Sequence, residues 1–290
     1  METLVAVSSP NFVSSVFHPT DFSDGSHLAF AHALAIALLR ETELTILHAG
    51  RDFLGEDEWT KFPAVRRTLE SWGCLEPGSP RSAVLEQLNV KVKKVNLRGR
   101  RPAAAIYRYV TEHDVDLIVL ASEGRDGLPG WLQPSVAERV ARETKLMTLF
   151  VPGGGRGFVN PRDGTISLSR ILVPVAHDPS AQSALGYAAR MAQFAAQPVE
   201  IVLLHVGEGP MPVLEQPVDP QLRFREERRS GRVIDEIELA ARELAVDLIA
   251  MTTDGRDGFL GVVGRGSHTE QVVRRAPCPV LAVPAIQKPT

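Results

Sequence analysis

Two parts of this chain are nearly the same. The segment Asp116–Gly127, which reads DLIVLASEGRDG, returns as Asp247–Gly258, which reads DLIAMTTDGRDG, and other segments recur around both copies in the same order. A repeat that spans most of a chain indicates two units with one fold. The 290 residues, 44% of them hydrophobic, also suffice for two ordinary domain cores. The sequence therefore predicts two domains, residues 1–152 and 170–290, joined by a glycine-rich linker at residues 153–169.

Each copy alternates short apolar runs with segments of helical spacing, which predicts alternating strands and helices. In the first copy the strands are expected at residues 16–20, 44–48, 90–95, 116–121 and 146–151, and the helices at 28–39, from 102 and at 135–142. In the second copy the strands are expected at 171–175, 199–205, 222–228, 247–251 and 280–283, and the helices at 180–194, at 233–244 and from 267. Such alternation requires parallel sheets, because parallel neighbours need crossover connections that cover the sheet faces.

A long excursion at residues 50–89 separates the second and third expected strands of the first copy. Its counterpart in the second copy is much shorter, so the second copy is expected to have lost one crossover helix. Trp59 and Trp72 lie in this excursion and Trp131 follows later. Their spacing fits core residues as well as a cover over the first domain's cleft, and it does not decide between the two.

The composition argues against several classes of protein. A net charge of -3 with both signs mixed gives no reason to expect nucleic acid or a membrane surface as a partner. Cys74 and Cys278 fall in different copies, so they predict no disulfide framework and suit a reducing compartment. No stretch reaches the length of a membrane span and the start does not read as a signal peptide, so we expect a cytoplasmic protein.

Catalytic and metal-binding patterns are not visible. The eight histidines form no HExxH or Cys/His spacing, so no metal site is predicted. No nucleophile elbow, paired carboxylates or Cys/His nucleophile arrangement stands out, which favours a protein that is not an enzyme. Weak ATP hydrolysis is a further class, although no catalytic base or Walker lysine supports it.

A basic run in the first copy has two interpretations. It comprises Lys91, Lys93, Lys94, Arg98, Arg100 and Arg101. It could bind phosphate or RNA, or its lysines could protect an edge strand from pairing with another chain. The matching segment at residues 223–228 mixes both signs, which favours edge protection over nucleic-acid binding.

Several motifs together resemble the universal stress protein family in its tandem two-domain form. They are Pro19–Ser23, the strand-ending pairs Leu47-His48 and Leu204-His205, the two Gly-Arg-Asp-Gly turns, Ser135–Val140 and Ala276–Val283. The resemblance covers nearly the whole chain. It implies two flavodoxin-like α/β domains of the adenine nucleotide alpha hydrolase type. Each would be an open five-stranded parallel sheet in the order 3-2-1-4-5 with helices on both faces, paired through the last strands.

The resemblance also implies a ligand in some members, ATP bound between the ends of strands one and four. In those members a loop of the form Gly, two residues, Gly, nine residues, Gly-Ser/Thr wraps the phosphates. The second copy has Gly255, Gly258 and Gly266-Ser267, but only seven residues separate Gly258 from Gly266. The first copy has Gly124 and Gly127, followed by Pro134-Ser135 instead of Gly-Ser. Proline offers no N–H donor, so we expect the first loop to hold phosphate poorly.

The residue expected to face the nucleoside is missing from the second copy. The family's Asp after the first strand is present as Asp21, whereas Ala176 takes its place in the second copy. The predicted nucleotide-binding residues are Thr20, Asp21, Gly124, Gly127 and Ser135 in the first copy, and Pro174, Val175, His205, Gly255, Gly258, Gly266 and Ser267 in the second. A structural interpretation competes with this one, because residues 135–138 and 267–270 each fit the Ser-x-x-Glu capping box.

These observations predict a stress-response regulatory protein that binds ATP or another adenine nucleotide in the C-terminal domain, with a degenerate N-terminal site. No metal is predicted beyond the magnesium that accompanies a nucleotide. The alternative is an interaction module of the same fold that binds no nucleotide and presents the excursion at residues 50–89 to a protein partner. Domain pairing within the chain is expected, with a homodimer as a further level of assembly.

Overall fold

The computed structural model describes residues 13–50, 56–98, 101–122, 136–153, 156–253 and 268–285. The first half contains β1 (Ser15–Thr20), α1 (Asp24–Arg40), β2 (Glu43–Gly50), η1 (Glu56–Lys61), α2 (Val65–Ser71), α3 (Ala83–Glu86), β3 (Lys91–Arg98), α4 (Pro102–Glu112), β4 (Leu117–Ser122), α5 (Val136–Thr144) and β5 (Met147–Pro152). The second half contains β6 (Arg170–Pro174), α6 (Gln182–Ala192), β7 (Val199–Val206), β8 (Leu222–Arg229), α7 (Val233–Glu243), β9 (Leu248–Thr253), α8 (His268–Arg275) and β10 (Val280–Pro284).

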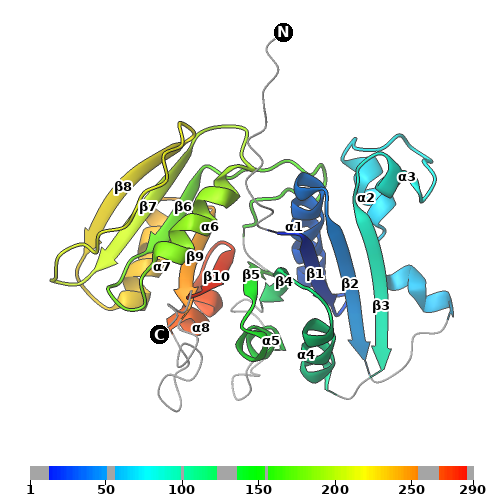
Figure 1. The fold of residues 1–290 in the computed structure, drawn as a ribbon, viewed down its shortest axis with the longest axis horizontal. Coiled ribbons are helices and arrows are strands. Elements are labelled where there is room, and N and C mark those ends of the chain that lie inside the picture. The colour runs from blue at the N-terminus through cyan, green and yellow to red at the C-terminus, as the bar shows by residue number, and fades with distance from the viewer. Residues whose placement is uncertain are drawn as a thin grey trace, which may run out of the picture.

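The strands form one 10-stranded sheet in the order β3-β2-β1-β4-β5-β10-β9-β6-β7-β8 (Figure 1). Neighbours within each half are parallel, and only the junction is antiparallel, with Leu281 of β10 opposite Leu149 of β5. Each half therefore has the strand order 3-2-1-4-5, and the halves pair through their last strands. The predicted fold class is confirmed.

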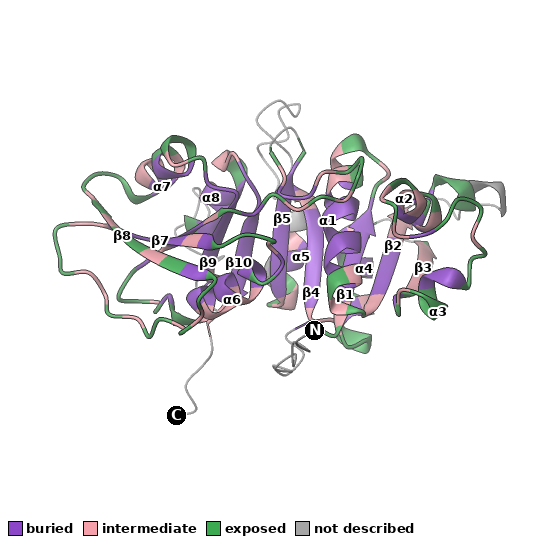
Figure 2. Cartoon of the chain, turned by 90° about the horizontal axis from the view of Figure 1, so that it is seen from above, coloured by how far each residue is buried: buried purple, intermediate pink, exposed green. Residues whose placement is uncertain are grey.

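Helices cover both faces of the sheet, and the core is continuous between the halves. One buried cluster contains Leu34 of α1 and Leu185 of α6 together with Leu149 and Leu281 from the junction. A second cluster on the other face joins residues of α4, α5, α7 and α8. Figure 2 shows that buried residues concentrate in the central strands. Each cluster thus contains side chains from both halves and packs them against each other.

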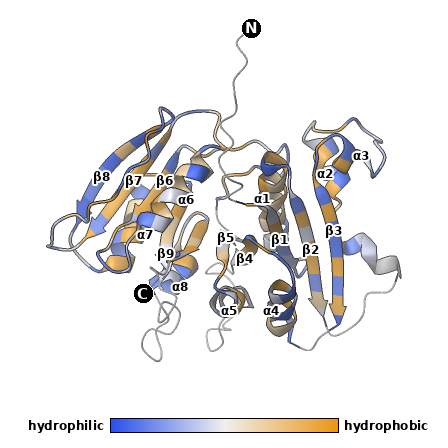
Figure 3. Cartoon of the chain, in the orientation of Figure 1, coloured by the Kyte–Doolittle hydropathy of each residue, from blue (hydrophilic) through white to orange (hydrophobic). Residues whose placement is uncertain are grey.

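The two edge strands carry the charged segments noted in the sequence. The basic strand β3 lies at one edge and the mixed strand β8 at the other. Lys91 and Lys93 form ion pairs with Glu43 of the neighbouring strand at 3.1 and 2.7 Å. Charged residues make up most of β8, with Leu222 and Phe224 as its apolar members, and the strand is largely hydrophilic in Figure 3. The position at the edge agrees with the edge-protection interpretation.

The connection between the second and third strands differs between the halves, as expected. In the first half it includes η1, α2 and α3, whereas β7 and β8 are joined by residues 207–221 without a helix. This second connection is fixed by Gln182, whose amide donates to the Glu215 carbonyl and accepts from the Glu215 N–H, both at 2.9 Å. The shorter second connection is therefore confirmed, and it lacks three helical segments where the loss of one helix was expected.

The described part of the linker, residues 156–169, folds against the first domain. Val159 and Ile166 form an antiparallel bridge, and Phe158 is buried. The Nε2 atom of His32 in α1 accepts from the N–H groups of Phe158 and Val159 at 3.1 and 3.3 Å, while its Nδ1 donates to the Leu28 carbonyl at 2.8 Å. Both ring nitrogens are thus satisfied by a neutral imidazole. His32 holds the linker on α1.

A second contact attaches the linker to the excursion of the first domain. The Trp72 indole donates to the Pro161 carbonyl at 3.2 Å. Gly164 has φ +72° and lies against the indole ring, where an added Cβ would come within 2.5 Å of it. Trp72 therefore packs between the core and the linker, whereas Trp59 is 39% exposed. Trp131 lies outside the described residues.

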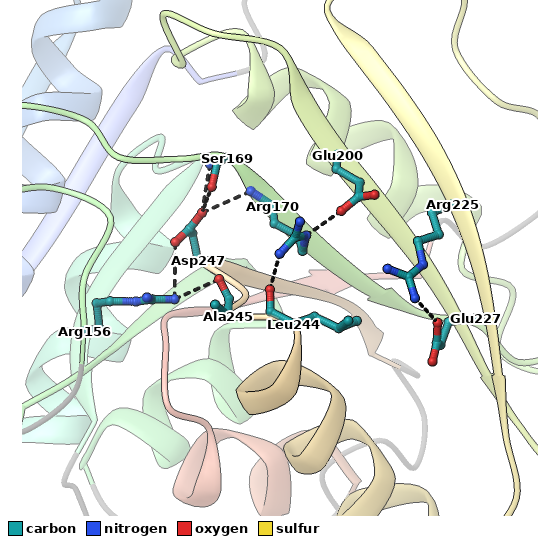
Figure 4. Close-up of polar contacts among 9 residues, drawn as sticks. All are labelled: Arg156, Ser169, Arg170, Glu200, Arg225, Glu227, Leu244, Ala245 and Asp247. Carbon is teal, nitrogen blue, oxygen red and sulfur yellow. Dashed lines mark hydrogen bonds and ion pairs between the residues drawn. The ribbon is translucent and has the colours of Figure 1, made fainter.

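The Asp that begins each repeated segment has a structural role, which Figure 4 shows for Asp247. Asp247 accepts through Oδ2 from the Ser169 N–H and hydroxyl and from the Arg170 N–H, at 2.8, 2.7 and 3.0 Å. On its other oxygen it forms an ion pair with Arg156 of the linker at 3.3 Å. Asp116 makes the same contacts with Ser14 and Ser15. Each Asp thus fixes the start of the neighbouring strand, β1 or β6, in the same way, which explains part of the sequence repeat.

Candidate nucleotide-binding site

Each half of the sheet has a point where the chain reverses the direction in which it adds strands. This switch point lies between β1 and β4 in the first half and between β6 and β9 in the second. The two ladders extend only to Phe17 opposite Ile118 and to Leu172 opposite Ile249. In open parallel sheets, ligands bind outside the carboxyl ends of the strands at such points. We call the carboxyl ends of β1, β2 and β4 the first site, and the carboxyl ends of β6, β7 and β9 the second site.

A histidine lies near the carboxyl end of the second strand at both sites and contacts the end of the first strand in the same way. His48 donates from Nδ1 to the Thr20 carbonyl at 2.9 Å, and His205 donates from Nδ1 to the Val175 carbonyl at 3.0 Å. The Val175 N–H in turn donates to the Leu204 carbonyl at 2.7 Å. The structure therefore brings Thr20 together with His48, and Val175 together with His205.

Polar groups at the first site are used by the local turn. The Thr20 hydroxyl oxygen accepts from the Phe22 N–H at 3.1 Å and from the Ser26 hydroxyl at 2.9 Å. Asp21 accepts from the N–H and hydroxyl of Ser23 at 3.0 and 2.6 Å, and Ser23 caps α1 by accepting from the Ser26 N–H at 3.2 Å. Asp21 thus supports the start of α1.

Aromatic rings cover the first site. Phe22 has φ +66°, and its ring stacks on His48 with 4.3 Å between centroids. Phe62, which is buried, contacts Phe22 edge-on at 5.4 Å, and Trp59 stacks on Phe62 at 5.2 Å. Lys94 lies 5.8 Å from the Phe62 ring centre. We call Phe22, His48, Phe62 and Trp59 the aromatic cluster. Two of its members come from the excursion, which contributes to covering the strand ends.

The second site has no aromatic counterpart of this cluster, although Met211 and Leu214 of its connection pack against the core and His205 is buried. Its connection, residues 207–221, contains no aromatic residue, and the repeat places His177 where Phe22 stands in the first copy. The His177 ring lies edge-on to that of His205 at 6.1 Å, and its Nε2 donates to the Pro210 carbonyl at 3.2 Å. Pro174 precedes these residues at the end of β6 and is partly exposed. Sequence reasoning missed this difference, although aligning Phe22 with His177 would have indicated it.

The glycine loops of the prediction lie outside the described residues. These are Gly124, Gly127 and Ser135 in the first copy and Gly255, Gly258, Gly266 and Ser267 in the second. The helices that follow them, α5 and α8, begin at Val136 and His268. The capping-box interpretation also falls on Ser135 and Ser267, so both interpretations stay predictions.

Metal, membrane and thiol chemistry can be judged in the part of the chain that the structure describes. There, no group of three or more His, Cys, Asp or Glu side chains is arranged to hold a metal ion, and no helix is long and apolar enough to cross a membrane. Burial raises the pKa of Cys278 to about 12 and also raises the pKa of Cys74. Both thiols therefore stay protonated at neutral pH, which makes them poor nucleophiles.

The fold and the two switch points define a class of protein. It is a tandem α/β protein with open parallel sheets, and each half has one set of carboxyl strand ends of the kind that binds ligands. Sequence comparison makes the assignment specific, because residues 15–152 and 213–284 match the model of the universal stress protein family. The chain belongs to the universal stress protein family, and its membership supports a role in stress response.

Two curated relatives come from Methanocaldococcus jannaschii. Universal stress protein MJ0531 is 29% identical over 143 residues, which is 49% of this chain and 83% of that protein. Universal stress protein MJ0577 is 25% identical over 151 residues, covering 47% of this chain and 93% of that protein. Each of these relatives therefore matches about half of the chain, as expected if the family unit occurs twice here.

A solved structure shows the same fold along the chain. A universal stress protein from Archaeoglobus fulgidus matches with a TM-score of 0.61 and 20% identity, covering 94% of this chain and 97% of that chain. The likeness at this identity concerns the fold, and it includes the tandem arrangement.

Proposed function

We propose that the protein is a stress-response regulator that binds an adenine nucleotide at the second site, whereas its first site is degenerate. The family assignment and the predicted glycine loop of the second copy support this proposal. Backbone N–H groups at Gly255, Gly258 and Gly266, with the Ser267 hydroxyl, would bind the phosphates, and magnesium would enter with the nucleotide. Binding is proposed to act as a signal and not to be coupled to turnover.

One observation carries the choice between the two sites. The aromatic cluster covers the strand ends of the first site, and Asp21 is engaged by Ser23. At the second site the ring next to the strand-ending histidine is the exposed side chain of His177, and the connection from β7 to β8 supplies no aromatic residue. A planar base therefore meets less competition from the protein's own rings at the second site.

Calorimetric titration of the full chain with ATP, ADP and AMP tests the proposal. We expect one nucleotide per chain. Gly266→Asp should abolish binding, because its carboxylate would repel the phosphates and its side chain would block the close backbone approach. Gly127→Asp, in the glycine loop of the first copy, should leave binding unchanged.

Two results would contradict the proposal. If millimolar nucleotide gave no heat with the wild-type chain, the alternative of a ligand-free interaction module that presents the excursion would be favoured. If Gly127→Asp abolished binding and Gly266→Asp did not, the nucleotide would belong to the first domain.

A further inference from the structure

The Nε2 atom of His205 is buried at the second site and has no hydrogen-bond partner. The residue as a whole is 7% exposed. Because Nδ1 donates to the Val175 carbonyl, the neutral ring carries its proton on Nδ1 and a lone pair on Nε2. The ligand-free protein therefore keeps an unused hydrogen-bond acceptor at the end of β7, an arrangement that native structures seldom leave without a reason.

A comparison with His18 separates this histidine from one that is simply enclosed by the core. His18 also has an unpartnered Nε2, but it lies within β1, is fully buried and packs against Phe30 of α1. Its counterpart in the second copy is Val173, so an apolar side chain suffices there. His205 instead stands at a carboxyl strand end, and its counterpart His48 is also a histidine.

A glycine lies two residues after each of these histidines and close to its Nε2 atom. An added Cβ at Gly50 would lie 2.8 Å from Nε2 of His48, whereas at Gly207 it would lie 3.7 Å from Nε2 of His205. Gly207 thus lies farther from Nε2 than Gly50 does, although His205 is buried and His48 is only partly buried. In the second copy the neighbouring ring is that of His177, which is exposed and is attached through one hydrogen bond to Pro210. A ligand could displace this ring at small cost.

We propose that Nε2 of His205 accepts a hydrogen bond from the exocyclic amino group of the bound base, and so selects 6-aminopurine over 6-oxopurine nucleotides. The inference rests on the proposed function, because it assigns a specificity-determining residue to the same site. Adenine presents N–H donors at position 6, which complement a lone pair. A 6-oxopurine presents an oxygen there, so two acceptors would face each other and both would lose their bonds to water. His177 moves aside when the base enters.

The test compares ATP with inosine triphosphate, which differs by an oxo group in place of the amino group. Calorimetry on the full wild-type chain should show ATP binding roughly tenfold to hundredfold tighter, as expected for one matched against one mismatched buried hydrogen bond. In His205→Asn the shorter amide can still donate to the Val175 carbonyl but offers no acceptor at the Nε2 position. Its preference for ATP should fall to within about threefold, mainly through weaker ATP binding.

His48→Asn in the first copy is the matched control and should keep the wild-type preference. If the wild-type chain binds neither nucleotide, the proposed function itself fails. If it binds ATP and inosine triphosphate equally, or if His205→Asn keeps the full preference, the proposed function stands and the role of His205 is wrong. The wild-type comparison needs no variant, so it decides the question even where a substitution impairs folding.

Discussion

At the scale of single residues, two histidines of the first copy are enclosed more completely than His205 of the second. His18 and His32 belong to the first copy and are both fully enclosed. Burial lowers the pKa of each to about 4, because the charged ring would lose its hydration. His32 is useful in its neutral form, since Nε2 must accept from the linker N–H groups. His18 only fills a position that Val173 fills in the other copy.

These pKa values predict a loss of stability in mild acid. An unfolded histidine takes up its proton near pH 6.5, whereas His18 and His32 in the folded chain do so near pH 4. Between these values the unfolded state binds more protons, so the free energy of unfolding falls as the pH decreases. By pH 5 each ring should have lowered it by about 2 kcal/mol.

Urea unfolding at pH 7.5 and pH 5 measures this effect. In His18→Val one of the two groups is removed, so the difference between the two pH values should shrink by about 2 kcal/mol. Carboxylates elsewhere contribute equally to the wild type and the variant, which makes their comparison specific. An unchanged pH dependence in the variant would show that His18 is not buried as described.

At the scale of elements, the packing of the linker and the excursion is the part of the structure that the sequence predicted least. Apolar periodicity predicted the strands and helices of the repeat because each element buries one stripe or face. It could not predict that the linker folds onto α1, since His32 and Phe158 lie far apart in the chain and the glycine-rich composition indicates a loop. The left-handed conformation of Phe22, which aims its ring at His48, likewise has no local sequence signal.

For the candidate site, the sequence predicted the matching histidines but not which site is covered. The pair Leu-His recurs at both strand ends, so their shared position could be inferred from the repeat. The cover depends on Phe62 and Trp59 of the excursion, which the second copy lacks. Contacts of this kind arise from packing between elements and not from spacing within one of them.

The contact between the linker and Trp72 can be tested by adding a methyl group. Gly164→Ala would force a Cβ to within 2.5 Å of the Trp72 ring at a position with φ +72°. Gly78 also has a positive φ, +82°, but an added Cβ would meet nothing within 4 Å. We therefore expect Gly78→Ala to lower the free energy of unfolding by about 1 kcal/mol and Gly164→Ala by about 3 kcal/mol.

Thermal or urea unfolding of both variants measures the difference, which isolates the steric clash from the cost of the backbone conformation. The fluorescence of Trp72 should also change in Gly164→Ala, because its indole would lose the hydrogen bond to Pro161. Equal destabilisation in the two variants would argue against a packed contact between the linker and the excursion.

The glycine in the middle of α6 gives a prediction of opposite sign. An added Cβ at Gly186 would meet nothing within 4 Å. Gly186→Ala should therefore stabilise the protein by roughly 0.5–1 kcal/mol, since alanine is the better helix former and restricts the unfolded chain. A higher urea midpoint with an unchanged m-value would confirm it, and a lower midpoint would reveal a neighbour that the structure does not place there.

At the scale of the whole molecule, the junction of β5 and β10 joins two sheets into one. Leu149 and Leu281 face each other across this junction and are fully buried. They belong to a core cluster that reaches α1 in one half and α6 in the other. Arg156 of the linker adds contacts to Asp247 at the base of β9. We therefore expect the two halves to unfold as one cooperative unit.

The positions of the tryptophans make this cooperativity measurable. All 3 tryptophans lie in the first half, so their fluorescence reports on that half alone. Leu281→Ala removes buried methyl groups from β10 in the second half and should lower the free energy of unfolding by about 2–5 kcal/mol. If the halves are coupled, the transition seen by tryptophan fluorescence should shift together with the one seen by circular dichroism.

Leu239→Ala on α7 serves as the control, because Leu239 is 44% exposed and its loss should move neither transition by more than about 0.5 kcal/mol. A tryptophan transition that stays in place in Leu281→Ala, while circular dichroism shows the second half unfolding earlier, would mean that the domains are independent. In that case a nucleotide bound at the second site could not act on the first half through the shared sheet. A common transition, in contrast, would let ligand binding in one domain stabilise the other, because both share one unfolding equilibrium.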